Sequence, residues 1–387
     1  MSNEFDSAMA IGEILQLLQF QPNLEADTSN IGVKAGQGFN SGKAILIAAS
    51  NPDPKENAIG KKECEVILNL LTRARRENLP VLFLWSTAGA RISEGEVGLS
   101  KISEVLKEIL KPRNFPIISI VLGPTAGIGS YVTTLSEFSF MVKGTQLFMT
   151  GPKVVAELTG VIETKEQTGG IKIHEKTGIP TDISQDLADL KEKLGNLLEV
   201  LIAENSVREF QYKAYFGKSI ELSLKRIAGR LCGQIVLAQR LGDPSNLEVR
   251  KLNMFLRTCC NLQLPLVTHI ETRGMMPGSR EEESGSLFQG AELMRLMASY
   301  PAFRVAVIRG GSVAGLHLAL GARGLSADYV LATPNADISG MAKSARQRFH
   351  DRPASPPWEL IEEGVVDEVI PGEEIALRIE SILNERT

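Results

Sequence analysis

The sequence is poor in the residues that build metal sites and disulfides. Its 387 residues include only four cysteines and four histidines. Cys259 and Cys260 are adjacent, and adjacent cysteines are not the C-x-x-C pair typical of metal or redox sites. With only four histidines, a metal site built from several histidines is also not expected. The composition therefore predicts a metal-free protein with reduced thiols, as is usual in the cytoplasm.

The sequence also lacks a large excess of charge and any long hydrophobic run. Its formal net charge is −4, which argues against nucleic acid as the main partner. No apolar stretch reaches the ~18–20 residues of a membrane span. The first ten residues are acidic, without the basic start and apolar core of a signal peptide. We therefore expect a cytoplasmic protein that binds neither nucleic acid nor membranes.

The first half of the chain alternates apolar strands with amphipathic helices. Residues 43–50 and the wholly apolar 79–85 predict strands, and residues 61–78 carry apolar side chains at helical spacing. A helix near 97–111 and a strand at 116–122 follow. Short apolar strands between helices are typical of a parallel sheet that is covered on both faces.

The second half repeats this order, which indicates a duplication. Pro80 matches Pro265, and Gly127 matches Gly315 at nearly the same separation. Alternating strands and helices in both halves predict an α/β protein with parallel layers. The repeated strand, helix, strand and strand are expected at 233–240, 246–263, 264–270 and 303–308.

An amphipathic helix at 184–205, with leucines at helical spacing, separates the halves. We expect it to close the first domain. The predicted domains are therefore residues 1–205 and residues 206–387.

A glycine-rich loop follows each of four apolar strands. Ligands of α/β sheets gather at the carboxyl ends of strands. A glycine loop that opens a helix leaves backbone N–H groups free, and two such donors can form an oxyanion hole. The chemistry can then be done by the backbone, without a side-chain acid. The loops are "TAGARISEG" (87–95), "GPTAGIGSY" (123–131), "ETRGMMPGS" (271–279) and "RGGSVAGLH" (309–317).

Two other polar features favour structural roles. In "SREEESG" (279–285), Ser279 is placed to cap a helix, with Glu282 completing a capping box. His174 lies in a predicted loop and can satisfy backbone groups there. His317 differs from it because it falls in a glycine loop.

The glycine loops, taken in order with the segments around them, resemble the carboxyltransferase family of acyl-CoA carboxylases. The resemblance covers roughly residues 40–387. It implies an α/β fold of duplicated crotonase-like (ClpP/crotonase) ββα-spiral domains. Beyond the loops, it rests on "GTQLFMTGPKVVAELTG", "TGGIKIHEKTG", "KLNMFLRTCCNLQLPLVTHIETRGMMPG", "ADYVLATPNADISGM" and "EEGVVDEVI".

The resemblance also implies a site. Two oxyanion holes are expected at Gly127–Ile128 and Gly315–Leu316, one for the enolate oxygen of an acyl thioester and one for the ureido oxygen of biotin. This sequence has Ile128 where the family usually has a second glycine. It has Leu316–His317–Leu318 where the family has Ala-Tyr-Asp. The residues expected to contact substrate are Ala88, Gly89, Ala90, Tyr131, Gly274 and His317, and no metal is expected.

The implied reaction is carboxyl transfer to or from the α-carbon of an acetyl- or malonyl-type acyl-CoA. Carboxybiotin on a separate carrier protein is the expected donor, which makes a biotin carboxylase and a biotin carrier protein possible partners. The thioester is coenzyme A or an acyl carrier protein. Because the family's active site lies between subunits, the resemblance implies a homodimer or a dimer-based oligomer.

Two alternatives stay open. "SREEESG" and "LHLALGARGLSADYVLATPNADISGM" also resemble a subunit of biotin-independent malonate decarboxylase, which breaks the same bond through the same enolate. In that reaction His317 or Tyr131 is a candidate acid that protonates the enolate. The third interpretation is a catalytically inactive assembly partner, with pockets closed by Ile128 and Leu316.

Overall fold

The computed structural model describes residues 5–22, 31–53, 56–349 and 354–386. It divides into two compact units, Met1–Gly195 and Asn196–Thr387. The division falls within helix α8 (Leu187–Ile202), before the end of the helix that we expected to close the first domain.

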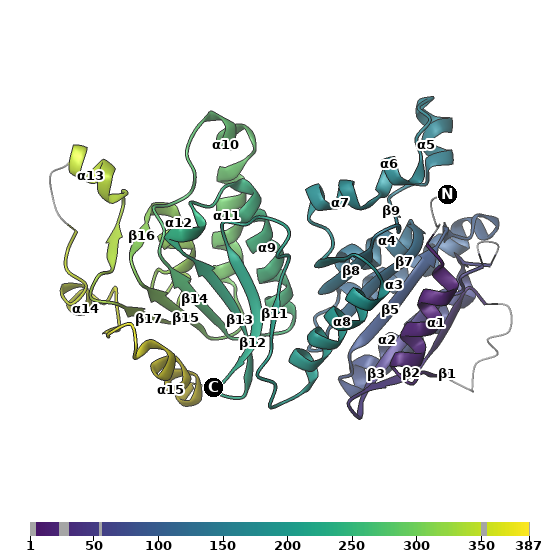
Figure 1. Ribbon diagram of the computed structural model, residues 1–387, viewed down its shortest axis with the longest axis horizontal. Coiled ribbons are helices and arrows are strands. Elements are labelled where there is room, and N and C mark those ends of the chain that lie inside the picture. Colours follow the sequence, from purple (N-terminus) through teal and green to yellow (C-terminus); the bar gives the residue numbers. More distant parts are fainter. Residues whose placement is uncertain (1–4, 23–30, 54–55, 350–353, 387) are drawn as a thin grey trace. The chain divides into compact units, whose positions relative to one another are not determined.

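The first unit is built on a mixed sheet whose strands run in the order β1-β2-β3-β5-β7-β8-β10 (Figure 1). The first three strands pair antiparallel, and the others pair parallel. A short strand, β9 (Leu147–Phe148), pairs with the end of β7, and β4 (Ala58–Ile59) pairs with β6 (Gly89–Ala90). The main strands are β1 (Gln21–Pro22), β2 (Val33–Asn40), β3 (Lys43–Ser50), β5 (Val81–Thr87), β7 (Ile117–Ala126), β8 (Phe138–Val142) and β10 (Asp182–Ser184).

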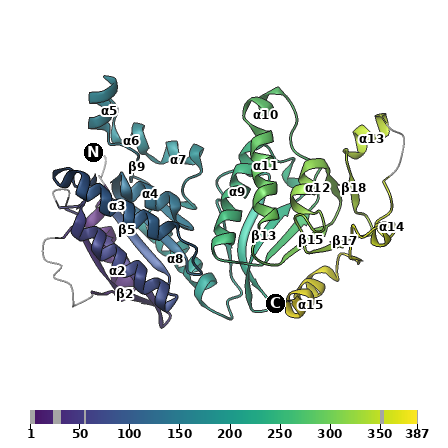
Figure 2. The same cartoon turned by 180° about the vertical axis from the view of Figure 1, so that it is seen from behind.

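Helices cover both faces of this sheet, as Figures 1 and 2 show from opposite sides. On one face, α2 (Lys61–Glu77), α3 (Gly95–Leu110) and α4 (Ile128–Leu135) enclose a core that includes Phe83 and Trp85. Helices α1 (Ser7–Leu17) and α8 lie on the other face. The remaining helices are α5 (Pro152–Thr159), α6 (Lys165–Gly169), α7 (Ile171–Thr177) and the single turn η1 (Ile92–Glu94).

The second unit repeats this plan. Its sheet has the order β11-β12-β13-β14-β15-β17-β19, with the first three strands antiparallel and the rest parallel. A separate pair, β16 (Gly311–Val313) with β18 (Asp337–Ser339), continues beyond β15. The main strands are β11 (Glu209–Gln211), β12 (Glu221–Ile227), β13 (Arg230–Leu237), β14 (Leu266–Ile270), β15 (Arg304–Ile308), β17 (Tyr329–Ala332) and β19 (Glu368–Val369).

Opposite faces of the second sheet are again covered by different helices. On β13, the space beside Gly233 is filled by Phe255 and Cys259 of α9 (Asn246–Asn261). On the other face, α15 (Ile375–Arg386) packs in a core with Val267 and Val305. The other helices are α10 (Ser279–Glu283), α11 (Ser286–Ala298), α12 (Ala314–Leu320), α13 (Lys343–Phe349), α14 (Glu359–Glu362) and the turn η2 (Gln239–Leu241).

The predicted duplication and parallel layers are thus present, while two local predictions are wrong. Ser279 does not cap α10, because Gly278 is the N-cap and Ser279 is the first helical residue. Glu281 instead accepts the N–H of Asn246 at the start of α9, at 2.7 Å, and so serves a helix distant in sequence. His174 lies on helix α7 rather than in a loop. It does satisfy a backbone group, since its Nε2 lies 2.8 Å from the carbonyl oxygen of Leu147.

Candidate active site

Two backbone segments meet at the carboxyl end of the first sheet. Gly89, in β6, has φ +94, and Gly127, which caps α4, has φ 57 and ψ −121. A Cβ atom placed on Gly127 would lie 3.3 Å from the Cα of Gly89 and 3.8 Å from the nitrogen of Ala90. The two segments therefore touch backbone to backbone. The structure brings Gly89, Ala90, Gly127 and Ile128 together, as the glycine loops suggested.

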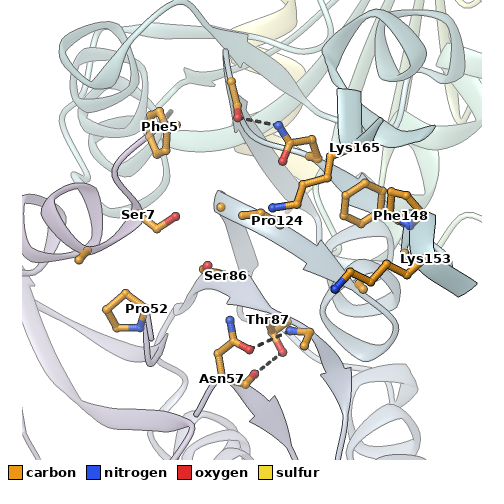
Figure 3. Close-up of a pocket in the computed structure, with 18 of the residues that line it drawn as sticks. Phe5, Ser7, Pro52, Asn57, Ser86, Thr87, Pro124, Phe148, Lys153 and Lys165 are labelled. Carbon is orange, nitrogen blue, oxygen red and sulfur yellow. Dashed lines mark hydrogen bonds between the residues drawn. The ribbon is translucent and has the colours of Figure 1, made fainter. Parts of the chain in front are cut away.

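A side-chain clamp holds the first of these segments in place. The hydroxyl of Thr87 donates to the carbonyl oxygen of Asn57 at 2.6 Å and accepts from the N–H of Gly89 at 3.1 Å. The N–H of Ala88 donates to Oδ1 of Asn57 at 3.2 Å (Figure 3). The Ala88 amide is therefore already occupied, whereas the side chain of Ala88 lines a cavity. The sequence analysis missed Asn57, which no motif marks.

A buried ion pair fixes the other end of the same segment. Glu63, almost fully buried, accepts from the N–H groups of Gly32 and Gly60 and from Arg91, the residue after β6. Burial works to raise the pKa of Glu63, but these donors outweigh it and hold the pKa below its ordinary value. The carboxylate therefore stays charged and keeps Arg91 against β4, where Arg91 also donates to the Ala58 carbonyl.

A cavity of about 800 Å³ opens beside these segments. Ala88 and Ala126 line it close to the two glycines. Lys153 and Lys165 extend toward it on one side, while Phe5, which precedes α1, lies on the other (Figure 3). The cavity thus offers two cations to an anionic ligand near the backbone segments. Sequence reasoning identified neither lysine, because no spacing links them to the loops.

Helix α4 begins directly after Gly127, so its first turn lies beside the two glycine segments. Among the described residues, no side chain caps α4. The Ile128 side chain belongs to the core under α2 and α3 and is 4% exposed, so it does not close the cavity. Tyr131, one turn further along, is 52% exposed. The first-turn N–H groups of α4 are the candidate donors, since no side chain of the described residues caps them.

The second unit builds the same motif from different side chains. The Thr272 hydroxyl accepts from the N–H of Gly274 at 3.2 Å, and Gly274 has φ +109. Asp243 takes the place of Asn57, because its Oδ1 accepts from the N–H of Arg273 at 3.4 Å. Gly274 lies next to Val313, which precedes α12.

The sheet register corrects one sequence landmark. Ser312 pairs with Ile338 as Thr125 pairs with Leu147, so the counterpart of Gly127 is the residue before Gly315. That residue is Ala314, which has φ +47, close to the φ of 57 at Gly127. Matching Gly127 to Gly315 was therefore wrong by one residue. A positive φ is uncommon but allowed for residues other than glycine, so the glycine was a misleading landmark.

The other site residues predicted in the second unit do not all line the same cavity. Gly315 and Leu316 line an apolar cavity of about 340 Å³, together with Met275 and Met294. His317 is not among the residues lining this cavity. Its Nδ1 lies 3.0 Å from the hydroxyl of Ser312 in β16, and burial lowers its pKa. His317 is thus held against the strand behind the helix.

The described ranges, 5–22, 31–53, 56–349 and 354–386, contain neither a candidate metal centre nor a membrane-spanning helix. There, no three His, Cys, Asp or Glu side chains come together in a way that could bind a metal ion. No helix in that part of the chain combines the length and the apolar character needed to span a bilayer.

The fold is shared with a structure determined for another protein. Transcarboxylase 12S superposes with a TM-score of 0.85 over 97% of this chain and 88% of that one, at 22% sequence identity. Two topologically matched units, each with backbone segments meeting at its sheet edge, define an α/β protein of duplicated crotonase-like domains. The predicted fold class is confirmed.

Sequence comparison gives the family. Residues 11–201 and 195–347 match the carboxyl transferase domain. The chain is 27% identical to the biotin-dependent acetyl-/propionyl-coenzyme A carboxylase beta6 subunit of Mycobacterium bovis, over 87% of this chain and 80% of that protein. It is also 27% identical to the methylmalonyl-CoA decarboxylase subunit alpha of Propionigenium modestum, over 81% and 70%. The chain belongs to the carboxyl transferase domain family and is an enzyme of the acyl-CoA carboxyltransferase type.

Proposed function

We propose that this protein transfers a carboxyl group to or from the α-carbon of a short-chain acyl-CoA, working with biotin attached to a separate carrier protein. Family membership supports the reaction class. The substrate range follows from the relatives, one of which is named for acetyl- and propionyl-coenzyme A. Our expectation of an acetyl- or malonyl-type substrate thus widens to include propionyl- and methylmalonyl-CoA.

The observation that carries the proposal is the direct approach of Gly89 to Gly127 at the uncapped start of α4. Removing the α-proton of a thioester, or its α-carboxyl group, leaves an enolate with negative charge on the thioester oxygen. Backbone donors fixed at that oxygen stabilise the charge, and loss of one donor costs ~2.7–4 kcal/mol in other enzymes. The Asn57–Thr87 clamp and the Glu63–Arg91 pair hold this backbone rigid, so no reorganisation is needed as the charge develops.

The lysine-lined cavity is the proposed site of the coenzyme. Coenzyme A carries phosphate groups, and lysine ammonium groups bind phosphate as point charges. Lys153 and Lys165 reach the cavity from the side where α5 and α6 begin, while Ala88 and Ala126 stand beside the glycines. Small side chains there leave room for a thioester to reach the backbone donors.

The second unit suits the ring of biotin. The ring is uncharged and compact, and the apolar cavity beside Gly315 and Leu316 is lined by Met275 and Met294. In the described part of the chain, no side chain caps α12, so its first N–H groups can donate to a ureido oxygen. Biotin, when bound, supplies the carboxyl group and a nitrogen that accepts the α-proton. The chain's own residues orient it and hold the oxygen.

We also propose that the protein works as a homodimer or a larger assembly. Exposed apolar side chains gather after β9 and along α5, where Met149 and Leu158 are largely exposed. In the second unit Leu287 and Phe288 of α11 are also exposed. Monomers rarely leave such patches uncovered. Transcarboxylase 12S is described as a hexamer.

One experiment separates the candidate functions. Purified protein is incubated with malonyl-CoA or methylmalonyl-CoA, with and without free biotin, and the decarboxylated acyl-CoA product is measured. We expect product only when biotin is present. Product without biotin would overturn the transferase proposal and favour decarboxylation, the alternative suggested by the similarity to methylmalonyl-CoA decarboxylase. No turnover with either thioester would favour a carrier-protein substrate or an inactive partner.

A further inference from the structure

The second unit holds a polar cavity that the proposed reaction does not use. It has a volume of about 560 Å³ and lies at the carboxyl end of the second sheet. Thr272, Arg273 and Asp337 line it. Thr87, Ala88 and Gln146 line the lysine-bearing cavity of the first unit, and the strand registers make the two sets equivalent. The polar cavity is therefore the duplicate of the proposed coenzyme site.

The lining of the polar cavity has changed in charge. Arg309 follows β15 at the position where the first unit has Leu122, which is fully buried in β7. Arg309 is held at three points. Its N–H donates to the Ile270 carbonyl at 2.9 Å, its carbonyl accepts from the Thr333 hydroxyl at 3.0 Å, and its Nε lies 3.4 Å from Nδ1 of His269.

These contacts leave the terminal guanidinium nitrogens of Arg309 available. Burial, together with the charge of Arg309, lowers the pKa of His269 to about 4, so the imidazole is neutral and accepts the Nε–H. The terminal nitrogens make no hydrogen bond or ion pair with any residue that the structure describes. A guanidinium with a fixed Nε and free terminal nitrogens is oriented in advance for a bidentate anion.

The other charges of the cavity are mostly paired. Arg273 forms an ion pair with Asp243 at 2.8 Å, and both oxygens of Asp337 accept from Arg346 at 2.9 Å. Lys343, at the start of α13, is an exposed cation with no ion pair to the described residues. Glu271 is a half-buried carboxylate that likewise forms no ion pair with them. The cavity thus offers two cations to an anion, and the carboxylate of Glu271 as an acceptor for a hydroxyl or amine.

We propose that this polar cavity binds a phosphate-bearing small molecule of nucleotide size. Its volume lies in the range of small-molecule sites, ~300–1,000 Å³. The phosphate lies against Arg309 and Lys343, and Glu271 accepts from hydroxyl groups of the same ligand. Because Val313, which leads into α12, also lines the cavity, a bound ligand contacts the segment that presents Gly315. The bound ligand takes no chemical part in the proposed carboxyl transfer.

The test uses the 387-residue chain with ADP as the probe, and isothermal titration calorimetry at constant ionic strength measures the binding. Arg309→Gln and Lys343→Gln should each weaken ADP binding about tenfold or more, which is the size of one lost charge-assisted contact. Arg295→Gln is the matched control, because Arg295 is an exposed arginine of α11 outside the cavity. It should leave ADP binding unchanged. Thermal unfolding checks that each variant is folded. The side chains of Arg309 and Lys343 are exposed, so their replacement should leave the core intact.

Three outcomes would overturn the proposal. The first is an absence of ADP binding at millimolar concentration. The second is loss of ADP binding in Lys153→Gln but not in Arg309→Gln, which would assign ADP to the first cavity. The third is competition by malonate as strong as that by inorganic phosphate, which would make the site one for carboxylates. Acyl-CoA turnover is measured on the same samples, so failure here is distinguishable from failure of the proposed function.

Discussion

Replacing Gly127 by alanine should damage turnover more than it damages the fold. The backbone at Gly127 has φ 57 and ψ −121, a conformation that costs other residues ~1–3 kcal/mol. The new Cβ would also lie 3.3 Å from the Cα of Gly89, closer than most real contacts, so the two segments must separate slightly. A displacement approaching 1 Å at a catalytic group can cost ~100-fold. We expect kcat for carboxyl transfer to fall at least about tenfold, with a loss of ~1–3 kcal/mol in unfolding free energy.

Gly160→Ala is the matched control. Gly160 has φ +71 and ψ 2 at the C-cap of α5, a left-handed conformation that also disfavours alanine, though less than the conformation at Gly127 does. Nothing lies within 4 Å of its Cβ position. This variant should lose stability without losing kcat. The assay is steady-state carboxylation of propionyl-CoA alongside thermal unfolding. If Gly127→Ala kept wild-type kcat while losing as much stability as Gly160→Ala, the contact between the glycine segments would be irrelevant to catalysis.

Three further predictions concern a histidine, a lysine and the assembly. His317→Gln should retain carboxyl transfer, because the ring is held by Ser312. A folded variant without activity would favour the decarboxylase alternative. Burial, with a smaller contribution from Lys251, lowers the pKa of Lys213 to about 7. The unfolded chain then binds more protons than the folded one between pH 7 and the ordinary lysine pKa, so stability should rise with pH there, by up to ~1.4 kcal/mol per unit. Lys213→Met should remove that slope in urea titrations, and an unchanged slope would refute this origin. Light scattering should give at least twice the chain mass of 42.1 kDa, and an active monomer would contradict the dimer.

The repeated strands and helices could be predicted because their signals are local. Residues 43–50 form β3, and the helix expected at 61–78 is α2. The apolar periodicity of a helix can be recognised from neighbouring residues alone. A strand that is buried on both faces is recognised as an uninterrupted run of apolar residues. The parallel topology then follows from the alternation of strands and helices.

The fine structure of the site could not be predicted in the same way. The residues 309–317 were read as one loop, yet they contain β16 and the start of α12, because β16 is defined by pairing with distant β18. The shift from Gly315 to Ala314 arises because a positive φ leaves no mark in the sequence when alanine adopts it. Asn57 and Lys165 were missed for a related reason, since only tertiary packing brings Asn57 to the segment before Gly89 and Lys165 to the cavity.

The central claim is that backbone N–H groups, rather than side chains, carry the chemistry. The direct test compares Ile128→Ala with Ile128→Pro, since both shorten the buried side chain but only proline removes the N–H. Proline is tolerated in the first turn of a helix, and the residue before it is the permissive Gly127. With circular dichroism and light scattering showing folded proteins of unchanged size, Ile128→Pro should turn over ~100–1,000-fold more slowly than Ile128→Ala. Equal turnover in the two variants would contradict the assignment of the Ile128 amide to an oxyanion hole.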